Sequence, residues 1–526
     1  ILNVLLYGRE CESGKQRDFY VRLRGCKDAQ ETLGRHLTDI FGVSYNDDSK
    51  EKVTHIVKVF KYNVIVQNLA PVAADNYKQT RITDSVALQH MNRILELALS
   101  KEKTTEALTE LFDELGSEVR DADIIRWYGT EANYYYLPEA LCVSIIKTLL
   151  EEKIETEPAE VNKRIEDLML NHCDNSMMAA VMDYAVIVAR LYEKALTLGS
   201  LTLNTADEYV MKYESDYCFI DQYYRQANET YFGIDPTCKL FDAVQKVKHC
   251  LDQNYSKLCN RINLEWTRCL KETGGMDEVH LLRQYNFYDE KIKPMQKKVA
   301  VIVSDALRYE VAQELVGELA KSKHIASLKP AIAMLPSETK YCKPSLLPHR
   351  ELKLYGKGEV QDMAVDDHIL DTTQKRSEHL QVYRDGAVCV PFETVAEYNQ
   401  EKNREIFKHP LVYIFHDVID KTGHDGNAKQ IVNSCRDAIL ELKNMIPKIH
   451  ASYNVTEIYI TSDHGFLFND IMFADKDKHK IEEEYLERST RYYLTKSKDK
   501  VSGVVKFPLS EVSGMVNVGD VIAGLP

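Results

Sequence analysis

This sequence of 526 residues lacks the features that define several other classes of protein. No run approaches the roughly 18 consecutive apolar residues of a membrane span, and no apolar signal segment opens the chain. The 12 cysteines form no C-x-x-C pair, so we expect neither a disulfide framework nor a thiolate zinc site. These absences predict a cytoplasmic protein with reduced, mostly buried thiols.

Positive charge is also scarce relative to negative charge. The chain has 67 Lys and Arg against 81 Asp and Glu, a formal net charge of −14. This balance argues against a basic coat for nonspecific nucleic-acid binding. A nucleic acid or nucleotide stays open as a substrate, because bound divalent ions can supply the positive charge that a phosphate needs.

The composition and the apolar spacing predict three regions. The length suits roughly three domains of about 150 residues. Residues 1–70 mix short apolar runs, such as THIVKVF at 54–60, with helical spacing, and predict a small α/β region. Residues 71–296 are predicted to be mainly helical, as in AVIVARLYEKALTLG at 185–199. Residues 297–526 are predicted to form an α/β domain.

Tyrosines are concentrated in the helical region, at 133–138 and 213–235. Interleaved with basic residues such as Arg225, they could stack on bases. The interpretation that we favour is an amphipathic packing face with the hydroxyls at its rim.

The α/β domain at 297–526 is organised around VAVIVSDALRYE at 299–310. Val299 to Val303 is an uninterrupted apolar run, which predicts a strand buried on both faces of a parallel sheet. Helical spacing is expected from Ala306 onward. Asp305 would then lie at the carboxyl end of a strand, where open α/β sheets bind their ligands, although a plain helix cap is the alternative.

Two further buried-strand patterns, LVYIF at 411–415 and EIYIT at 457–461, end in the same way. The residues that follow them and could bind metal are His416, Asp417, Asp420 and His424 after the first, and Ser462, Asp463 and His464 after the second. Carboxylate and imidazole groups are ligands for zinc or manganese. Three such strand ends in one sheet predict a site for two metal ions.

A hydroxyl that could act as a nucleophile lies between the first and second clusters. A strand pattern from Ala331 ends in Pro336, Ser337, Glu338 and Thr339. A metal ion can ionise such a hydroxyl when no histidine base is near. A Ser/Thr-rich turn is the alternative interpretation.

In this order, the motifs SDALRYE, LPSET, D-x-x-G-H and SDHG resemble the PglZ domain of the alkaline phosphatase superfamily. The similarity is closest to the PglZ proteins of BREX phage-defence systems. It implies an alkaline phosphatase-like α/β domain, with a mostly parallel sheet flanked by helices, preceded here by a large mainly helical region. It also implies a metal-dependent phosphatase or phosphodiesterase, with other BREX proteins as partners.

The resemblance also implies roles for individual residues and two divalent metal ions, zinc or manganese. One ion would be surrounded by Asp305, Thr339, Asp463 and His464, with Thr339 also the nucleophile. Asp420 and His424 would hold the other.

The chain departs from the superfamily pattern at the second metal. A further histidine is expected in a segment rich in glycine, but after His464 only His479 remains, within a charged stretch. Either this ligand lies beyond Pro526 or the second site is incomplete. The alternative function is therefore a catalytically weak or inactive scaffold in a multi-protein defence complex.

Arg308 is the one arginine within the metal-bearing motifs. It is expected on the same helix face as Asp305, as a candidate catalytic guanidinium or as a structural ion pair with Glu310. Without a clear guanidinium clamp, phosphodiesters should be preferred over the more negatively charged monoesters.

Residues 350–385 are polar and poor in motifs. We expect a surface insertion with a solvated acidic face. His368, beside Asp366, Asp367 and Asp371, is an alternative accessory metal site.

Overall fold

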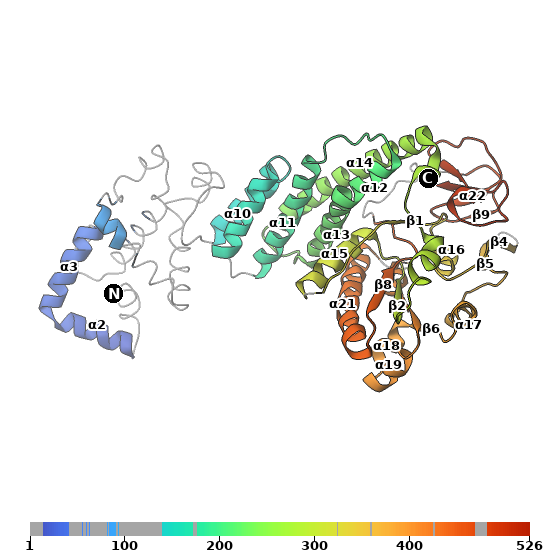
Figure 1. The fold of residues 1–526 in the computed structure, drawn as a ribbon. Helices are drawn as coiled ribbons and strands as arrows, with labels where there is room; N and C mark the ends of the chain where they lie inside the picture. The colour runs from blue at the N-terminus through green and yellow to red at the C-terminus, as the bar shows by residue number, and fades with distance from the viewer. Residues whose placement is uncertain are drawn as a thin grey trace. The chain divides into compact units, whose positions relative to one another are not determined.

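A computed structural model describes most of the chain (Figure 1). The described residues are 14–41, 139–171, 176–322, 324–357, 360–423, 427–468 and 481–525, together with positions 55, 59, 63, 82, 84–90 and 93. They belong to two compact units, residues 1–189 with 234–247 and residues 190–233 with 248–526. Among these described residues, every helix is too short or too polar to cross a membrane.

The described residues of the first unit are mainly helical. Its helices are α2 (Lys15–Gly25), α3 (Lys27–Phe41), α9 (Glu139–Thr148), η3 (Leu149–Lys153), α10 (Pro158–Asn171) and the first part of α11 (Ser176–Leu196). His55, Val59 and Asn63 lie in helix, where Asn63 Nδ2 donates to Val59 O at 2.7 Å. The other residues of the run at 54–60 lie outside the described residues, so the α/β region at 1–70 stays a prediction. Short apolar runs fit a buried helix as well as a strand. The other apolar runs of the expected α/β region lie outside the described residues.

The second unit begins with more helices. They are the end of α11, α12 (Ala206–Lys212), η4 (Tyr213–Tyr217), α13 (Cys218–Gly233) and α14 (Phe241–Thr273). Thr205 caps α12 in a capping box with Glu208. The expected helical region before the sheet is confirmed at these segments.

The tyrosines of these helices pack against their neighbours. The ring of Tyr224 stacks on that of Tyr255 at 3.6 Å between centroids. The hydroxyls of Tyr213 and Tyr255 each donate to Asp221 at 2.8 Å. For these side chains the packing interpretation is confirmed, because their faces are covered by other residues of the same unit.

A parallel sheet with strand order β6-β7-β2-β8 carries the candidate site. Its strands are β2 (Val299–Ser304), β6 (Val388–Pro391), β7 (Leu411–His416) and β8 (Glu457–Thr461). Val299 lies opposite Leu411 on one side and Glu457 on the other. The three strands expected from apolar runs are confirmed. Their carboxyl ends meet at one edge of the sheet.

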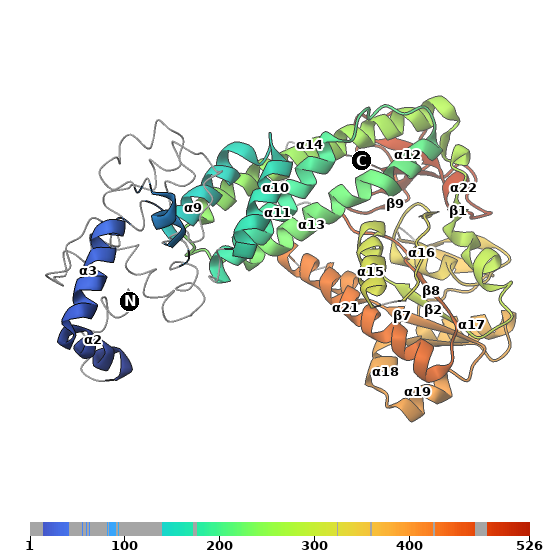
Figure 2. The same ribbon diagram turned by 60° about the vertical axis from the view of Figure 1, so that its left-hand side comes forward.

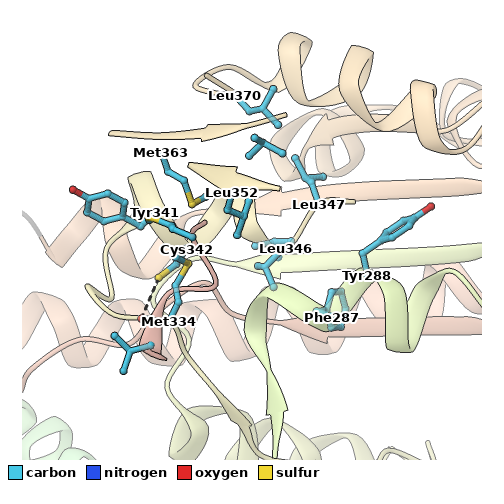
Figure 3. Close-up of a cluster of buried hydrophobic side chains, with 14 of the residues drawn as sticks. Phe287, Tyr288, Met334, Tyr341, Cys342, Leu346, Leu347, Leu352, Met363 and Leu370 are labelled. Carbon is cyan, nitrogen blue, oxygen red and sulfur yellow. Dashed lines mark hydrogen bonds between the residues drawn. The ribbon is translucent and has the colours of Figure 1, made fainter. Parts of the chain in front are cut away.

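Alternate residues of β2 face two different cores. Ala300 and Ile302 face a core built with α15 (Tyr309–Lys321) and α21 (Ala428–Tyr453), which lie along the sheet in Figure 2. Val301 and Val303 face a second core, part of which is drawn in Figure 3. This two-sided burial explains why the strand sequence is apolar throughout.

The described part of the second unit has three other sheets and contains further helices and strands. They are η5 (Gly275–Glu278), β1 (Leu282–Arg283), η6 (Gln284–Asn286), η7 (Tyr288–Ile292), β3 (Ala331–Ile332), α16 (Thr339–Ser345), β4 (Leu352–Lys357), β5 (Val360–Val365), α17 (Thr373–Tyr383), α18 (Phe392–Glu397), α19 (Gln400–Ile406), α20 (Val418–Gly423), β9 (Glu487–Arg488), β10 (Tyr493–Thr495), β11 (Val505–Pro508), α22 (Leu509–Val512) and β12 (Ile522–Leu525). Strands β11-β12-β10-β9 form a separate antiparallel sheet.

The strand pattern before Thr339 is shorter than expected. Only β3 forms, and it pairs in parallel with β1 rather than with the main sheet. Thr339 is therefore not at a strand end but is the first residue of helix α16.

The surface insertion expected at 350–385 is confirmed only in part, because the acidic side chains of Asp367 and Asp371 are exposed but the apolar residues are not. Strands β4 and β5 form a hairpin, and Leu352, Met363 and Leu380 are buried in the second core (Figure 3 labels the first two). Asp366 accepts hydrogen bonds from two backbone N–H groups and from the Tyr383 hydroxyl. The apolar residues of this segment are sparse in sequence but converge in space.

Candidate metal centre

Three buried ligand groups meet at the carboxyl ends of β2 and β8. Asp305 directly follows β2, while Asp463 and His464 lie just beyond β8. One ligand atom from each of the three residues lies within 4.8 Å of the others, the one such group in the described part of the chain. Because β2 and β8 are neighbouring parallel strands, their ends place these side chains together.

The acceptor atoms of this cluster lack donors. Asp305 Oδ1 and Asp463 Oδ2 are buried, and neither has a hydrogen-bond partner among the described residues. His464 Nε2 lies 3.3 Å from Asp305 Oδ1 and 3.7 Å from Asp463 Oδ2. Burial, followed by the charge of Asp305, raises the pKa of Asp463 well above its usual range. The donor set therefore fits a divalent cation, which would satisfy both orphaned oxygens.

The remaining polar atoms of these side chains hold them in place. Asp463 Oδ1 accepts from the backbone N–H of Ala306 at 3.2 Å and of His464 at 2.9 Å. His464 Nδ1 donates to Gly465 O at 2.9 Å, which leaves the Nε2 lone pair facing the carboxylates. Such supporting bonds fix the orientation of metal ligands.

Thr339 lies beside this cluster, as the sequence predicted. Its Oγ1 is 2.8 Å from His464 Nε2, so the hydroxyl can donate to the ring nitrogen. Glu338, the residue before it, accepts from Ser489 Oγ at 2.8 Å and from Tyr492 Oη at 3.4 Å. The start of α16 is thereby tied to the turn between β9 and β10.

The second predicted metal set is only partly described. Asp420 lies half-buried on α20. His424 and His479 lie outside the described residues. The role of Asp420 and His424 in holding a second ion stays a prediction.

Arg308 lies elsewhere than expected. The helix begins at Tyr309 rather than at Ala306, which has a left-handed φ of 61°, so Arg308 does not share a helix face with Asp305. Its Nη2 donates to Asp221 Oδ2 at 2.9 Å, and Glu310 is farther away, at 3.9 Å. The expected ion pair thus forms mainly with a residue of α13, a partner that sequence spacing could not reveal.

Two polar residues outside the motifs also contact the centre. Gln284 Nε2 donates to the carbonyl oxygens of Ser462 and Asp463, and its Oε1 accepts from Met334 N at 3.2 Å. Lys343 Nζ forms an ion pair with Asp305 Oδ2. Sequence analysis missed both, because an isolated Gln and a helical Lys carry no distinctive pattern.

His416 was also expected at the strand ends, but its hydrogen-bond partners are not the ligand groups of the cluster. Its Nδ1 is 2.9 Å from Ser304 Oγ, and its Nε2 is 3.3 Å from Glu441 Oε2. The side chain is 1% exposed, and burial lowers its pKa to about 4. His416 is therefore a neutral, hydrogen-bonded residue of the sheet edge.

This burial predicts that stability falls on mild acidification. The pKa of His416 rises to about 6.5 on unfolding, so the unfolded state takes up the proton first as the pH drops. Between about pH 7 and pH 5, the parent should lose about 2 kcal/mol more unfolding free energy than His416→Asn. Urea denaturation at each pH measures this difference. His249→Asn, at an exposed histidine, should keep the slope of the parent, and equal slopes in all three proteins would contradict the prediction.

Comparison with known proteins gives a consistent result. Residues 287–523 match the family model described as the BREX system PglZ alkaline phosphatase-like domain. The chain is 24% identical over 340 residues to the alkaline phosphatase-like protein PglZ of Bacillus cereus, an alignment that covers 62% of this chain and 38% of that protein. It is 33% identical over 204 residues to the alkaline phosphatase-like protein BrxZ of Escherichia coli, covering 37% of this chain and 23% of that protein. The chain therefore spans well under half the length of these relatives.

Proposed function

Because residues 287–523 match the family model of the BREX system PglZ alkaline phosphatase-like domain, we propose that this chain is a metal-dependent phosphoester hydrolase of a BREX phage-defence system. The observation that carries the proposal is the contact of 2.8 Å between Thr339 Oγ1 and His464 Nε2, beside the orphaned oxygens of Asp305 and Asp463. A hydroxyl, an imidazole and two carboxylates are thus gathered at one buried point.

Asp305, Asp463 and His464 would hold a divalent ion, zinc or manganese, with the Thr339 hydroxyl next to it. The ion would supply positive charge that favours the ionised hydroxyl and the developing charge on phosphorus-bound oxygens. Asp420 and His424 are proposed to hold a second ion, as the family resemblance implies.

Thr339 is proposed as the nucleophile. Its Oγ1 forms a bond to phosphorus, the bond from phosphorus to the leaving oxygen breaks, and the alcohol departs with a proton. Water then hydrolyses the phosphothreonine, which releases phosphate from a monoester or a phosphomonoester from a diester and restores the hydroxyl. Burial of Asp305, Asp463 and His464 limits competition by bulk water when the Thr339 hydroxyl attacks phosphorus.

Thr339→Ala should retain metal binding and lose hydrolysis, because the two carboxylates and His464 remain while the attacking oxygen is removed. The expected fall in kcat is at least about 100-fold, with zinc content near that of the parent. Turnover of nitrophenyl phosphate esters, measured with zinc or manganese added, tests this.

Thr339→Ser is the matched control and should keep much of the activity, since it preserves the hydroxyl. Activity of Thr339→Ala within a few-fold of the parent would mean that water attacks directly. A parent that binds metal but turns over no ester would instead favour the scaffold function.

The partners follow from the same family. We propose that the chain assembles with other BREX proteins and that its substrate is a nucleic acid, a nucleotide or another phosphoester. Copurification with the remaining proteins of a BREX system would test the assembly independently of catalysis.

A further inference from the structure

A buried lysine lies at the centre described above. The Lys343 side chain is 10% exposed, and its Nζ forms an ion pair with Asp305 Oδ2. Among the described residues, Asp305 is the one hydrogen-bond partner of this ammonium, although its charge also acts on Asp463. An ammonium group has three donors, so Lys343 can make further hydrogen bonds.

Helix geometry places Lys343 on the same side as Thr339. Both belong to α16 and are four residues apart, a spacing that puts side chains on one helix face. Thr339 reaches His464, and Lys343 reaches Asp305. The two side chains therefore converge on one cluster from one helix.

The two oxygens of Asp305 have different surroundings. Oδ2 accepts from Lys343, while Oδ1 lacks a donor and lies 3.3 Å from His464 Nε2. Asp305 can thus bind a cation through Oδ1 and keep its ion pair with Lys343 through Oδ2. The ammonium stays beside the place where the hydroxyl of Thr339 would meet phosphorus.

Resting on the proposed function, we propose that Lys343 binds the phosphoryl group, donating one hydrogen bond to Asp305 and another to a non-bridging phosphoryl oxygen. It supplies the cationic clamp that Arg308 does not, since the Arg308 guanidinium is directed at Asp221. Ammonium groups bind phosphate as point charges.

Lys340, on the same helix, is a lysine whose contacts are structural. Its Nζ donates to Gln361 O at 2.8 Å and forms an ion pair with Glu487. Both of its partners lie outside the candidate centre, which makes Lys340→Met the matched control.

The proposal predicts effects of opposite sign on two ligands. Removing the positive charge beside Asp305 should strengthen zinc binding, because one repulsive neighbour of the ion is lost. It should weaken binding of inorganic phosphate to the zinc-loaded protein by about 10- to 100-fold, the effect of losing a hydrogen bond between charged groups. If the ion pair between Lys343 and Asp305 were purely structural, its loss would not raise zinc affinity while lowering phosphate affinity.

The experiment measures zinc affinity, and then phosphate affinity at saturating zinc, by calorimetry for the parent, Lys343→Met, Lys343→Arg and Lys340→Met. Lys343→Met should bind zinc at least as tightly as the parent and phosphate far more weakly. Lys343→Arg should retain most of the phosphate affinity, and Lys340→Met should match the parent. Phosphate affinity unchanged in Lys343→Met, or lost together with zinc affinity, would overturn the proposal.

A second readout uses turnover. Because a monoester carries more negative charge than a diester, Lys343→Met should lower kcat/KM on nitrophenyl phosphate more than on bis-nitrophenyl phosphate. In the parent, the positive charge of Lys343 should reduce the ratio of kcat/KM on the diester to kcat/KM on the monoester below the ratio expected from the sequence. If Lys343→Met fails to fold, Lys343→Gln takes its place. If the parent hydrolyses neither ester, the proposed function fails, while phosphate binding still decides the role of Lys343.

Discussion

Asp463→Asn should abolish stabilisation of the protein by zinc and, at the same time, make the metal-free protein more stable. Asp463 Oδ1 accepts from Ala306 N and His464 N, and an amide oxygen can keep both bonds. The amide nitrogen would then replace Oδ2, where it cannot bind a metal but can donate to Asp305 Oδ1. Zinc at about 100 times its Kd should stabilise the parent by about 2.7 kcal/mol, and the variant hardly at all.

The higher stability expected of metal-free Asp463→Asn has an electrostatic cause. The pKa of Asp463 is raised by burial and by Asp305, so its protonated form is favoured by folding. The resulting stability is present below about pH 4 and is lost as the pH rises through the folded pKa. Near pH 7 and without metal, Asp463→Asn should therefore have an unfolding free energy about 1–3 kcal/mol above that of the parent.

Urea denaturation with and without zinc measures both effects. Asp520→Asn, at a carboxylate whose side chain is 81% exposed, is the control and should change neither. A variant that is less stable without metal and is still stabilised by zinc would contradict the assignment of Asp463 as a ligand.

Arg225→Met should destabilise the protein by about 3–5 kcal/mol. Arg225 is 1% exposed and donates to both carboxylate oxygens of Glu310, at 3.0 to 3.1 Å. Glu310 is fully buried, and removing its main partner would leave a buried charge with only Arg308, at 3.9 Å. The pair joins α13 to the first turn of α15, close to Asp305.

The double variant Arg225→Met with Glu310→Leu should recover most of this loss, because no fully buried charge is then left unpaired. Glu314, the other partner of Arg225, is 23% exposed and can be hydrated. The unfolding free energies of the parent, the two single variants and the double variant form the required cycle. Arg436→Met removes an exposed arginine paired with Glu229 and should cost under about 1 kcal/mol. Strictly additive losses in the cycle would mean that the two side chains do not act as a pair.

The main sheet could be predicted from the sequence because β2 and β7 are buried on both faces and therefore read as unbroken apolar runs. Parallel strands bring their carboxyl ends together, so the meeting of Asp305 with Asp463 also followed from the pattern. Their role as metal ligands stays a prediction.

Other parts could not be predicted because they depend on contacts between distant residues. Lys343 looks like any helical lysine until α16 is packed against Asp305. Arg308 is paired with Asp221, which lies 87 positions earlier in the chain. The buried hairpin β4–β5 and the short strand β3 depend on tertiary packing that local composition does not encode.

The most direct test of the metal centre is anomalous diffraction at the zinc edge from crystals of the zinc-loaded protein. We predict a peak within about 2.0–2.2 Å of Asp305 Oδ1, Asp463 Oδ2 and His464 Nε2, with Thr339 Oγ1 beside it. The peak should be missing from Asp463→Asn crystals. Zinc bound only at other positions, with these three side chains left without an ion, would contradict the account.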